Sequence, residues 1–409
     1  MDIKIEPRIL SGKVKIPPSK SVSHRVLISA ALASGTSEIK GIMNSKDIIA
    51  TTECLKAMGA NITEYDGVSQ ITGISSVSEN AVLNCCESGS TLRFLIPVAA
   101  VLGINATFIG KGRLPERPII PYLRELSKHG IEFNYNGTMP FSISGKLSGG
   151  KYEIEGDISS QFITGLFFAL PLCKEDSEIH MLSPLQSKPY ADMTIETLRR
   201  FGIFIKSTDY GYYIEGNQRY KSYDTIIEGD YSQAAFFYVA NALGSKIELS
   251  NLSPDSKQGD KKILDILSKL CYNDECSEFN IDVSDIPDLV PILAVLGSFG
   301  KKPMRISNAE RLKIKESDRL LAISEALNAI GGKVVTLNDG IVILPIEEFH
   351  GGVVNSYNDH RIVMATAIAS TKSKAPIIIR GAESVDKSYP GFFDEFNALG
   401  GNSYVISLE

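Results

Sequence analysis

LKAMGANI at residues 55–62 begins as an amphipathic helix, reaches a glycine and continues as a strand-like run. Four further copies and one degraded copy of this pattern are LSKHGIEF (126–133), LRRFGIFI (198–205), LNAIGGKV (327–334), FNALGGNS (396–403) and the degraded LSKLCYND (267–274). Each glycine suits the residue just after a helix, where the backbone turns left-handed. The glycines, with Cys271 in the degraded slot, recur every 60 to 72 residues, which predicts six copies of one structural unit.

A polar cluster followed by an apolar helix recurs at a similar spacing. Its six copies are SKSVSHR (19–25), ESGSTLR (87–93), DISSQF (157–162), DYSQAAF (230–236), SDIPDLV (284–290) and NDHRIVM (358–364). Each helix is apolar on nearly all sides, so we expect each to be buried. With β-rich stretches between them, the two patterns predict six βαβαββ units. The simplest arrangement is an α/β protein of two domains with three units each.

The composition narrows the class of function. The 409 residues include 42 basic and 48 acidic side chains, and this net charge of −6 argues against binding to nucleic acid or to an anionic membrane. The five histidines and six cysteines are scattered, so neither a zinc site nor a disulfide framework is expected. The N-terminal MDIKIEPRIL lacks the apolar run of a signal peptide, and the longest apolar run, 94–110, is broken by Pro97 and Gly103. We therefore expect a cytoplasmic protein that does not span a membrane.

The polar clusters place anion-binding groups where helices begin. A helix N-terminus presents unpaired N–H groups and about half a positive charge, which favours anions. Lys20, Arg25 and Arg361 add cations beside apolar segments, where a surface charge has little structural use. Simple N-capping is the alternative for any one cluster, because Ser and Asp commonly begin helices. Together, the clusters predict an anion-binding cleft if the helix entrances converge.

Three further stretches are rich in charge, namely GKGRLPERP (110–118), RLKIKESDRL (311–320) and ESVDKSYPG (383–391). Proline-stiffened loops of arginines favour preorganised binding of phosphate or carboxylate, because the guanidinium fork makes two parallel hydrogen bonds. A solvated charged face is the alternative for each stretch.

Read in order, the motifs resemble those of the 5-enolpyruvylshikimate-3-phosphate synthase family. The motifs are SKSVSHR, ESGSTLRF, ERP, DISSQF, SKPY, IPD, KESDR, NDHR and the segment around Lys387, and the resemblance spans about residues 7–400. It implies a two-domain inverse α/β barrel of six βαβαββ repeats. Residues 16–226 would form one domain, residues 1–15 with 227–409 the other, and the active site would lie in the interdomain cleft.

The resemblance also implies a reaction. Members of the family transfer the enolpyruvyl group of phosphoenolpyruvate to the 5-hydroxyl of shikimate-3-phosphate and release phosphate, a step of aromatic amino acid biosynthesis. They need no metal or organic cofactor, and glyphosate occupies their phosphoenolpyruvate site. The two substrates are the only partners expected, and a monomer is expected.

The same resemblance assigns residues to the two substrates. The shikimate-3-phosphate site would comprise Lys20, Ser21, Arg25, Ser159, Ser160, Gln161, Ser187, Tyr190, Asp288 and Lys315. The phosphoenolpyruvate site would comprise Lys20, Gly89, Arg117, Gln161, Arg319, Arg361 and Lys387. Gly89, which has no side chain, would let phosphoenolpyruvate approach the backbone closely.

Catalysis requires one group to take the hydroxyl proton and another to deliver and retrieve the methylene proton. Asp288 of IPD is the candidate for the hydroxyl proton. Glu316 of KES is the candidate for the methylene proton, with Lys315 and Lys20 assisting.

Four positions depart from the more familiar bacterial pattern. Glu87 stands where Asn is common, Ser90 where Thr is common, and both His24 and Arg311 stand where Asn is expected. These departures concern local contacts with shikimate-3-phosphate and leave the expected reaction unchanged.

Three other functions were weighed against this one. The sister enzyme that transfers enolpyruvyl to UDP-N-acetylglucosamine carries, in its familiar form, a cysteine just before the arginine that matches Arg117, and none lies between Cys86 and Cys173 here. A non-catalytic anion-binding repeat protein would be expected to lose some of the catalytic side chains, and all are present. RNA 3′-phosphate cyclases share the repeat idea but not this order of motifs.

Overall fold

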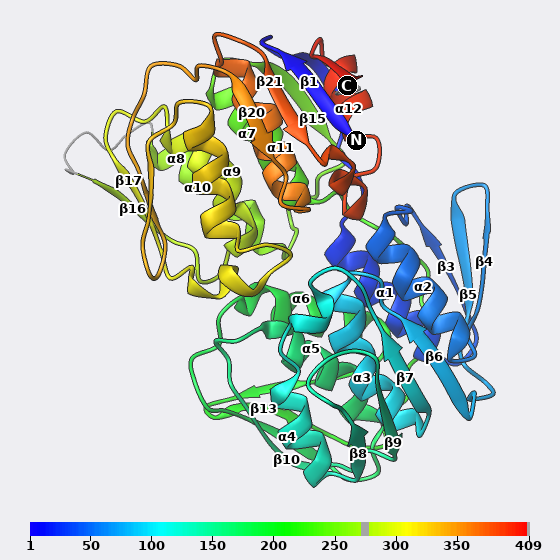
Figure 1. Ribbon diagram of the computed structural model, residues 1–409. Coiled ribbons are helices and arrows are strands. Elements are labelled where there is room, and N and C mark those ends of the chain that lie inside the picture. The colour runs from blue at the N-terminus through cyan, green and yellow to red at the C-terminus, as the bar shows by residue number, and fades with distance from the viewer. Residues whose placement is uncertain (271–277, 407–409) are drawn as a thin grey trace. The chain divides into compact units, whose positions relative to one another are not determined.

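The computed structural model describes residues 1–270 and 278–406 (Figure 1). The chain forms two compact units. Pro18–Glu228 make one, here called the central unit, and Met1–Pro17 with Gly229–Glu409 make the other, the terminal unit. The predicted boundaries, after residues 15 and 226, lie two residues earlier.

The central unit holds three four-stranded sheets of identical strand order, β14-β3-β5-β4, β6-β7-β9-β8 and β10-β11-β13-β12. The strands are β3 (Thr36–Lys40), β4 (Asn61–Tyr65), β5 (Val68–Thr72), β6 (Asn80–Asn84), β7 (Asn105–Ile109), β8 (Ile131–Asn134), β9 (Phe141–Gly145), β10 (Gly150–Ile154), β11 (Ser177–Met181), β12 (Lys206–Thr208), β13 (Gly211–Ile214) and β14 (Thr225–Ile226). The helices are α1 (Lys20–Leu32), α2 (Lys46–Ala57), α3 (Gly89–Leu102), α4 (Ile120–Lys128), α5 (Ser160–Ala169) and α6 (Lys188–Arg200). Helices α1, α3 and α5 are buried along most of their length, as their all-round apolar sequences predict.

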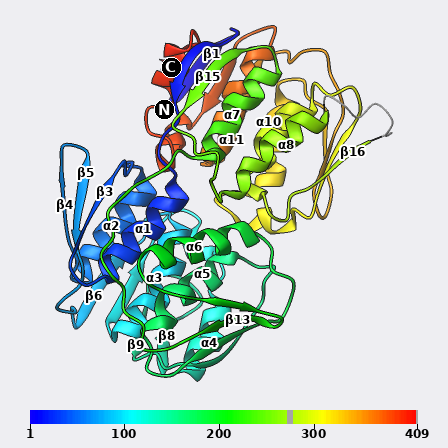
Figure 2. The same cartoon turned by 180° about the vertical axis from the view of Figure 1, so that it is seen from behind.

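The terminal unit repeats this order in β16-β17-β19-β18 and β20-β21-β1-β22, and adds the parallel pair β15-β2. The strands are β1 (Asp2–Glu6), β2 (Ser11–Lys15), β15 (Lys246–Ser250), β16 (Phe279–Asp282), β17 (Met304–Ser307), β18 (Val334–Thr336), β19 (Ile341–Ile343), β20 (Gly352–Asn355), β21 (Ile377–Arg380) and β22 (Asn402–Ile406). The helices are α7 (Tyr231–Ala242), α8 (Ile263–Leu270), α9 (Val290–Gly297), α10 (Arg319–Ala329), α11 (His360–Ala369) and α12 (Phe392–Ala398). Helices α7 and α11 pack side by side in the core of this unit (Figures 1 and 2).

The predicted α/β fold of βαβαββ repeats is confirmed in five of the six copies. In these copies the first two strands are parallel. In four of them the last two strands form an antiparallel hairpin beside the parallel pair, and in the fifth the antiparallel pair is β1 with β22. The sixth copy has the parallel pair β2–β15, and its degraded motif runs into residues 271–277, including Cys271, which lie outside the described residues. The five motif glycines follow helix ends with φ between +80° and +114°, so the predicted left-handed turn is present in each.

The chain passes between the units twice, after Pro17 and after Glu228. The two passages are hydrogen-bonded to each other. The Ser19 amide donates to the Glu228 carbonyl at 2.7 Å, and the Asp230 amide donates to the Pro17 carbonyl at 2.9 Å. Strand β1 completes the sheet of β20, β21 and β22, so the first residues of the chain pair with the last strand.

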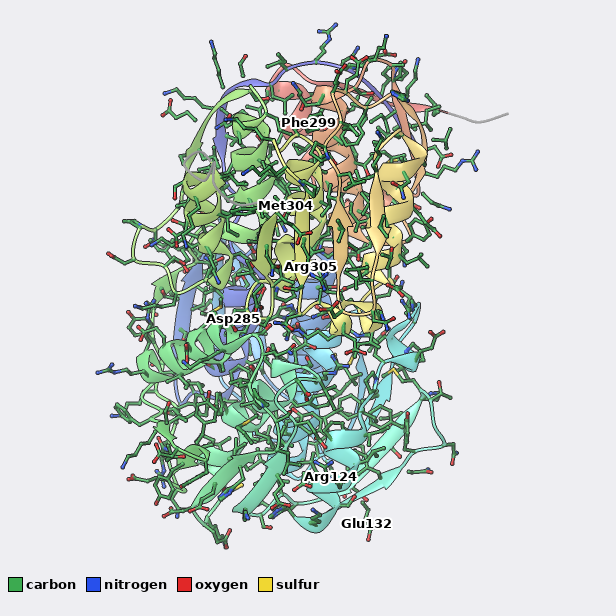
Figure 3. All side chains as sticks on the ribbon, turned by 90° about the vertical axis from the view of Figure 1, so that its left-hand side faces the viewer. Arg124, Glu132, Asp285, Phe299, Met304 and Arg305 are labelled. Carbon is green, nitrogen blue, oxygen red and sulfur yellow. The ribbon has the colours of Figure 1, made fainter. Side chains whose placement is uncertain are left out.

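Parallel pairing fixes where the helix entrances lie. In β16 and β17, Asp282 is level with Ser307, so the segments that follow both strands leave from the same end of the sheet. Asp285, just after β16, and Phe299, before β17, lie at opposite ends of the terminal unit (Figure 3). The same rule holds for β6 with β7 and for β20 with β21.

The repeat glycines differ in the room around them, which gives a test of the fold. Gly59 has φ +114°, and a Cβ there would lie 2.4 Å from the Ser76 carbonyl oxygen. Gly202, also just after a helix of the central unit, has φ +80°, and its Cβ would meet only the flexible Lys221 side chain at 3.3 Å. We expect Gly202→Ala to cost about 1 kcal/mol of unfolding free energy through backbone strain, and Gly59→Ala about 2–4 kcal/mol. Urea denaturation of both variants measures this, and equal losses would contradict the placement of Gly59.

Candidate functional site

The predicted site residues all lie in segments that follow strand ends, and they divide between the two units. Ten belong to the central unit: Lys20, Ser21, Arg25, Gly89, Arg117, Ser159, Ser160, Gln161, Ser187 and Tyr190. Six belong to the terminal unit: Asp288, Lys315, Glu316, Arg319, Arg361 and Lys387.

The entrance of α1 begins with a capped turn and a half-buried ion pair. Ser19 caps the helix by accepting from the Val22 amide, while the Ser23 hydroxyl donates back to the Ser19 carbonyl at 2.8 Å. Lys20 Nζ lies 2.9 Å from Asp47 Oδ2, and the two side chains are 15% and 13% exposed. Asp47, which the sequence did not single out, thus holds the Lys20 ammonium at the first turn of α2.

Arg25 is buried and fastens α1 to α6. Its Nε donates to Thr194 Oγ1 at 2.8 Å, and its terminal nitrogens donate to the Ser21 and Tyr190 carbonyls at 2.7 and 3.0 Å. Its guanidinium also lies 5.5 Å from the Phe94 ring centroid. Burial lowers the pKa of Arg25 to about 10, so it stays charged at neutral pH. The cation therefore fixes Ser21 and Tyr190, two other predicted site residues.

His24 starts a chain of buried hydroxyls that joins α1, α2 and α3. Its Nδ1 lies 2.8 Å from Thr51 Oγ1, which lies 2.6 Å from Thr91 Oγ1. Thr91 Oγ1 donates to Ser88 Oγ at 2.7 Å, and Ser88 caps α3. Burial lowers the pKa of His24 well below its usual value, and the charges of Lys20 and Arg25 add to this. The ring is therefore neutral, and its role is to order the helix entrances.

Gly89 opens α3 and lies against Arg117. A Cβ at Gly89 would lie 2.3 Å from Arg117 Nη1 and 2.5 Å from its central carbon, so only glycine leaves room for this guanidinium. Arg117 is buried, with 6% exposure. The guanidinium of the ERP motif therefore occupies the space that a side chain at residue 89 would fill.

Arg93 was not among the sixteen predicted site residues, yet it holds one of them, Gln161. Its Nη1 donates to Gln161 Oε1 at 2.8 Å, and its Nη2 donates to the Pro118 carbonyl at 3.1 Å. Gln161 in turn donates to Ser90 Oγ at 2.9 Å. The signal in the sequence was an arginine inside an apolar helix, which is the same signal that pointed to Arg25.

The remaining residues of the central unit are hydroxyls at two helix starts. Ser159 caps α5 and accepts from the Gln161 amide, and both Ser159 and Ser160 are buried. Ser187, buried before α6, has φ +56°, an uncommon conformation for a residue other than glycine.

In the terminal unit, Asp288 is held between two arginines. Its Oδ1 accepts from Arg319 Nη1 at 3.0 Å and its Oδ2 accepts from Arg361 Nη2 at 2.9 Å. Arg361 also donates to the Asp288 backbone carbonyl at 3.1 Å. Burial alone would raise the pKa of Asp288, but the charges of Arg361, Arg319 and Lys315 outweigh it and hold this pKa well below its usual range. The carboxylate is therefore ionised at neutral pH.

Arg319 is the centre of this cluster, with 1% of its side chain exposed. Besides Asp288, it donates to Glu316 Oε2 at 2.9 Å and, through Nε, to Asp359 Oδ2 at 2.9 Å. Burial works against its charge, but Asp359, Glu316 and Asp288 outweigh burial and raise the pKa of Arg319. Asp359, which was not a predicted site residue, also accepts from Ser317 Oγ at 3.0 Å and from the Arg361 amide at 2.9 Å. It thereby joins the KESDR and NDHR motifs.

Lys387 is buried and donates to the Asn358 carbonyl at 2.6 Å, so it lies beside the NDHR motif. The positive charge of Lys315 helps to lower the pKa of Asp288. Among the departures from the family pattern, Arg311 donates to the Ser284 carbonyl and ties the KESDR segment to the loop before Asp288. Glu87 lies against Gly112 of the 110–118 loop, where a Cβ would meet its Oε2 at 2.6 Å.

Within residues 1–270 and 278–406, no group of three or more His, Cys, Asp and Glu side chains is arranged to hold a metal ion. No helix in this same part of the chain has the length and apolar character needed to cross a membrane.

A family profile described as EPSP synthase (3-phosphoshikimate 1-carboxyvinyltransferase) matches residues 5–396. The chain belongs to the EPSP synthase family. It is 47% identical to the 3-phosphoshikimate 1-carboxyvinyltransferase of Clostridium kluyveri, over 98% of this chain and 97% of that protein. It is 45% identical to a protein of the same name from Clostridium perfringens, over 97% and 98% of the two chains. The solved EPSP synthase of Acinetobacter baumannii shares the fold, with a TM-score of 0.81 at 24% identity over 99% of this chain and 100% of that one.

The family match confirms the resemblance read from the motifs. The matched span contains all sixteen predicted site residues of this EPSP synthase family member. It also contains the pairing side chains Asp47, Arg93 and Asp359, which are not among those sixteen residues.

The buried ring of His24 predicts a pH-dependent loss of stability. Because its pKa is lowered in the folded protein, the unfolded chain takes up a proton more readily below about pH 6.5. The stability that the fold gains by keeping the His24 ring neutral is therefore fully present above pH 6.5 and declines as the pH falls. His24→Asn, the residue expected from the family pattern, removes it. We expect the unfolding free energy of wild type to fall by about 1 kcal/mol relative to that of His24→Asn between pH 7.5 and pH 5.5.

Urea denaturation at the two pH values measures this difference. His350→Asn, at an exposed histidine, is the control and should show no such change. A constant difference for His24→Asn would mean that the ring is charged or solvated in the folded protein.

Proposed function

We propose that the chain transfers the enolpyruvyl group of phosphoenolpyruvate to the 5-hydroxyl of shikimate-3-phosphate and releases phosphate. The observation that carries this proposal is the gathering of buried arginines, lysines and helix N-termini after the parallel strands of both units, in a member of the EPSP synthase family. Both substrates carry a phosphate and a carboxylate, and such groups bind guanidinium forks and helix N-termini. We further propose that both units contribute to one active site and that the protein acts as a cytoplasmic monomer.

The central unit supplies groups suited to shikimate-3-phosphate. In the proposal, Ser159, Ser160 and Ser187 hold the 3-phosphate, since their hydroxyls and the adjacent helix N-termini are anion donors. Arg25 and Ser21 complete this site, and Tyr190 packs near the ring. Gln161, held by Arg93, lies between the two substrates.

The terminal unit supplies cations for phosphoenolpyruvate. Arg319, Arg361 and Lys387 take this role together with Arg117 and Lys20, and Lys315 serves the shikimate side. In the structure Arg319 and Arg361 are paired with carboxylates, so an anionic ligand competes with Asp288 for Arg361.

This competition bears on catalysis. While Arg319 and Arg361 hold both oxygens of Asp288, this carboxylate is a weak base. A substrate phosphate or carboxylate that draws Arg361 away removes one positive charge from Asp288 and so makes it a stronger base. Basicity then increases only once phosphoenolpyruvate is bound.

The reaction balances with two acid–base groups. Asp288 takes the 5-hydroxyl proton as this oxygen bonds to C2 of phosphoenolpyruvate, and Glu316 delivers a proton to the methylene carbon. In the second step the bond from C2 to the phosphate oxygen breaks, and phosphate leaves with the electron pair and takes up the proton that Asp288 removed from the 5-hydroxyl. The methyl group returns a proton to Glu316, so both carboxyl groups regain their starting states. Lys20 and Lys315 offset the negative charge during both steps.

The proposed activity is tested by phosphate release. Purified protein with phosphoenolpyruvate and shikimate-3-phosphate should release phosphate, and phosphoenolpyruvate with UDP-N-acetylglucosamine should not. The reverse result would assign the sister reaction, and release with neither acceptor would favour a non-catalytic anion-binding protein. Size-exclusion chromatography of the same sample should give the mass of one chain, and a larger mass would contradict the proposed monomer.

The contact of Gly89 with Arg117 yields a sharper prediction. A methyl group at residue 89 must displace the Arg117 guanidinium, so Gly89→Ala should raise the KM for phosphoenolpyruvate by roughly tenfold or more and weaken inhibition by glyphosate. Arg117→Ala should do the same, and the double variant should add little, because both changes remove one contact.

Steady-state kinetics of the two single variants and the double variant measure this coupling. Arg113→Ala, an exposed arginine of the same loop that pairs with Glu116, is the control and should change KM by less than about twofold. Fully additive effects of Gly89→Ala and Arg117→Ala would show that the two residues act separately.

A further inference from the structure

A buried carboxyl group lies next to the Asp288 cluster and is not explained by the roles assigned above. Asp260 belongs to the 3₁₀ helix Gly259–Lys262, which packs on α7 and α8. Gln258, just before it, accepts from the Tyr231 amide at 3.0 Å and donates to the Gly229 carbonyl at 2.8 Å. The segment is therefore anchored to the first turn of α7.

Asp260 is buried in a way that is costly for a carboxyl group. Only 3% of the residue is exposed, and its Oδ1 has no hydrogen-bond partner among the residues that the structure describes. A buried polar atom without a partner destabilises a fold unless another interaction compensates. Such a group in a native core calls for a functional explanation.

The elements around Asp260 carry the catalytic candidates. Helix α7 contacts the 3₁₀ helix of Asp260, the 3₁₀ helix Pro287–Leu289 that carries Asp288, and α11, whose first turn carries Arg361. The cap of α7 is Asp230, which accepts from the Ser232 amide at 2.9 Å. Three carboxylates thus surround the entrance of one helix.

The charges that act on Asp260 come from these elements. Burial, with added contributions from Asp288 and Asp230, raises the pKa of Asp260 to about 7, against the opposing charge of Arg361. The Ser232 hydroxyl also faces it. The other charged residues nearby do not face Asp260. In the same 3₁₀ helix, Lys261 donates to the Pro254 carbonyl and Lys262 is exposed, and Asp265 of the adjoining α8 is exposed too. The pKa of Asp260 therefore depends mainly on its burial and on the charges of Asp288, Asp230 and Arg361.

We propose that Asp260 is a positioning residue that controls how Arg361 is shared between Asp288 and an anionic substrate. This inference rests on the proposed function, in which Arg361 binds phosphoenolpyruvate. When Asp260 is protonated, it is neutral, and Arg361 is available to the substrate. When Asp260 is ionised, it adds a negative charge beside Arg361, which retains the guanidinium and repels the incoming anion.

Asp260→Asn tests the proposal, because the amide has the shape of the carboxyl group and stays neutral at every pH. Between pH 6.5 and pH 8.5 the KM for phosphoenolpyruvate should rise in wild type. The factor of this rise should be roughly ten times the factor for Asp260→Asn. The KM for shikimate-3-phosphate should change equally in both proteins. Asp260→Glu should restore a pH dependence, and Asp265→Asn, the same change at an exposed site, should match wild type.

Equal pH profiles of wild type and Asp260→Asn would overturn the proposal. A wild type without activity would instead overturn the proposed function, so the two failures are distinct. If Asp260→Asn does not fold, Asp260→Ser provides a smaller neutral side chain for the same comparison.

Stability gives a readout that needs no substrate. A carboxyl group with a raised pKa stabilises the fold fully below its unfolded value near pH 4, and this contribution is lost as the pH rises to about 7. The melting temperature of Asp260→Asn relative to wild type should therefore increase from pH 5 to pH 7 and then stay level. A difference that does not change with pH would show that Asp260 does not titrate in this range and would count against the proposal.

Discussion

Parallel pairing of the first two strands in each repeat is the constraint on which the rest of this structure depends. Two parallel neighbours end at the same edge of a sheet, so the segments that follow them start side by side. Asn84 is level with Ile109, and Gly89 and Arg117 follow these two strands and touch. The same relation between Asn355 and Arg380 brings the NDHR motif next to Lys387. The antiparallel pair of strands beside them only extends each sheet, which explains why the predicted site residues gather at one edge.

The buried cations of the two units have different kinds of partner. In the central unit, cations are held mainly by neutral oxygens, as with Arg25 on the Thr194 hydroxyl and two carbonyls. These partners leave the positive charge available to a ligand. In the terminal unit, Arg319 and Arg361 are paired with carboxylates, so their charges are largely balanced before any ligand arrives. In the proposed reaction, a substrate anion that binds there exchanges partners with an existing ion pair, and this exchange alters the charge around the carboxylates as well.

The repeat could be predicted from the sequence, but the contacts between side chains of different repeats could not. The left-handed glycines and the buried helices follow from local spacing and local composition, so they could be predicted. The partner of Arg319 could not, because Asp359 is 40 residues away and its carboxylate looks locally like a simple helix cap. The hydroxyl chain from His24 to Ser88 spans three helices, and the depth at which Asp260 is buried depends on how its 3₁₀ helix packs on α7. Departures such as Arg311 looked like losses of a ligand contact, and in the structure Arg311 joins two motif-bearing segments.

The insertion of β1 between β21 and β22 has a consequence for biosynthesis. Residues 18–228 are continuous, so the central unit can fold as soon as they have left the ribosome. The terminal unit needs β1, which precedes the central unit in the chain, to pair with β21 and β22, which follow it. At ~5–20 residues per second, the leading strand waits on the order of tens of seconds for its partners. During that interval its buried face, Ile3 and Ile5, has no sheet to join, so a nascent chain exposes an unpaired, partly apolar strand. A chaperone that binds the chain during translation would find its target in β1.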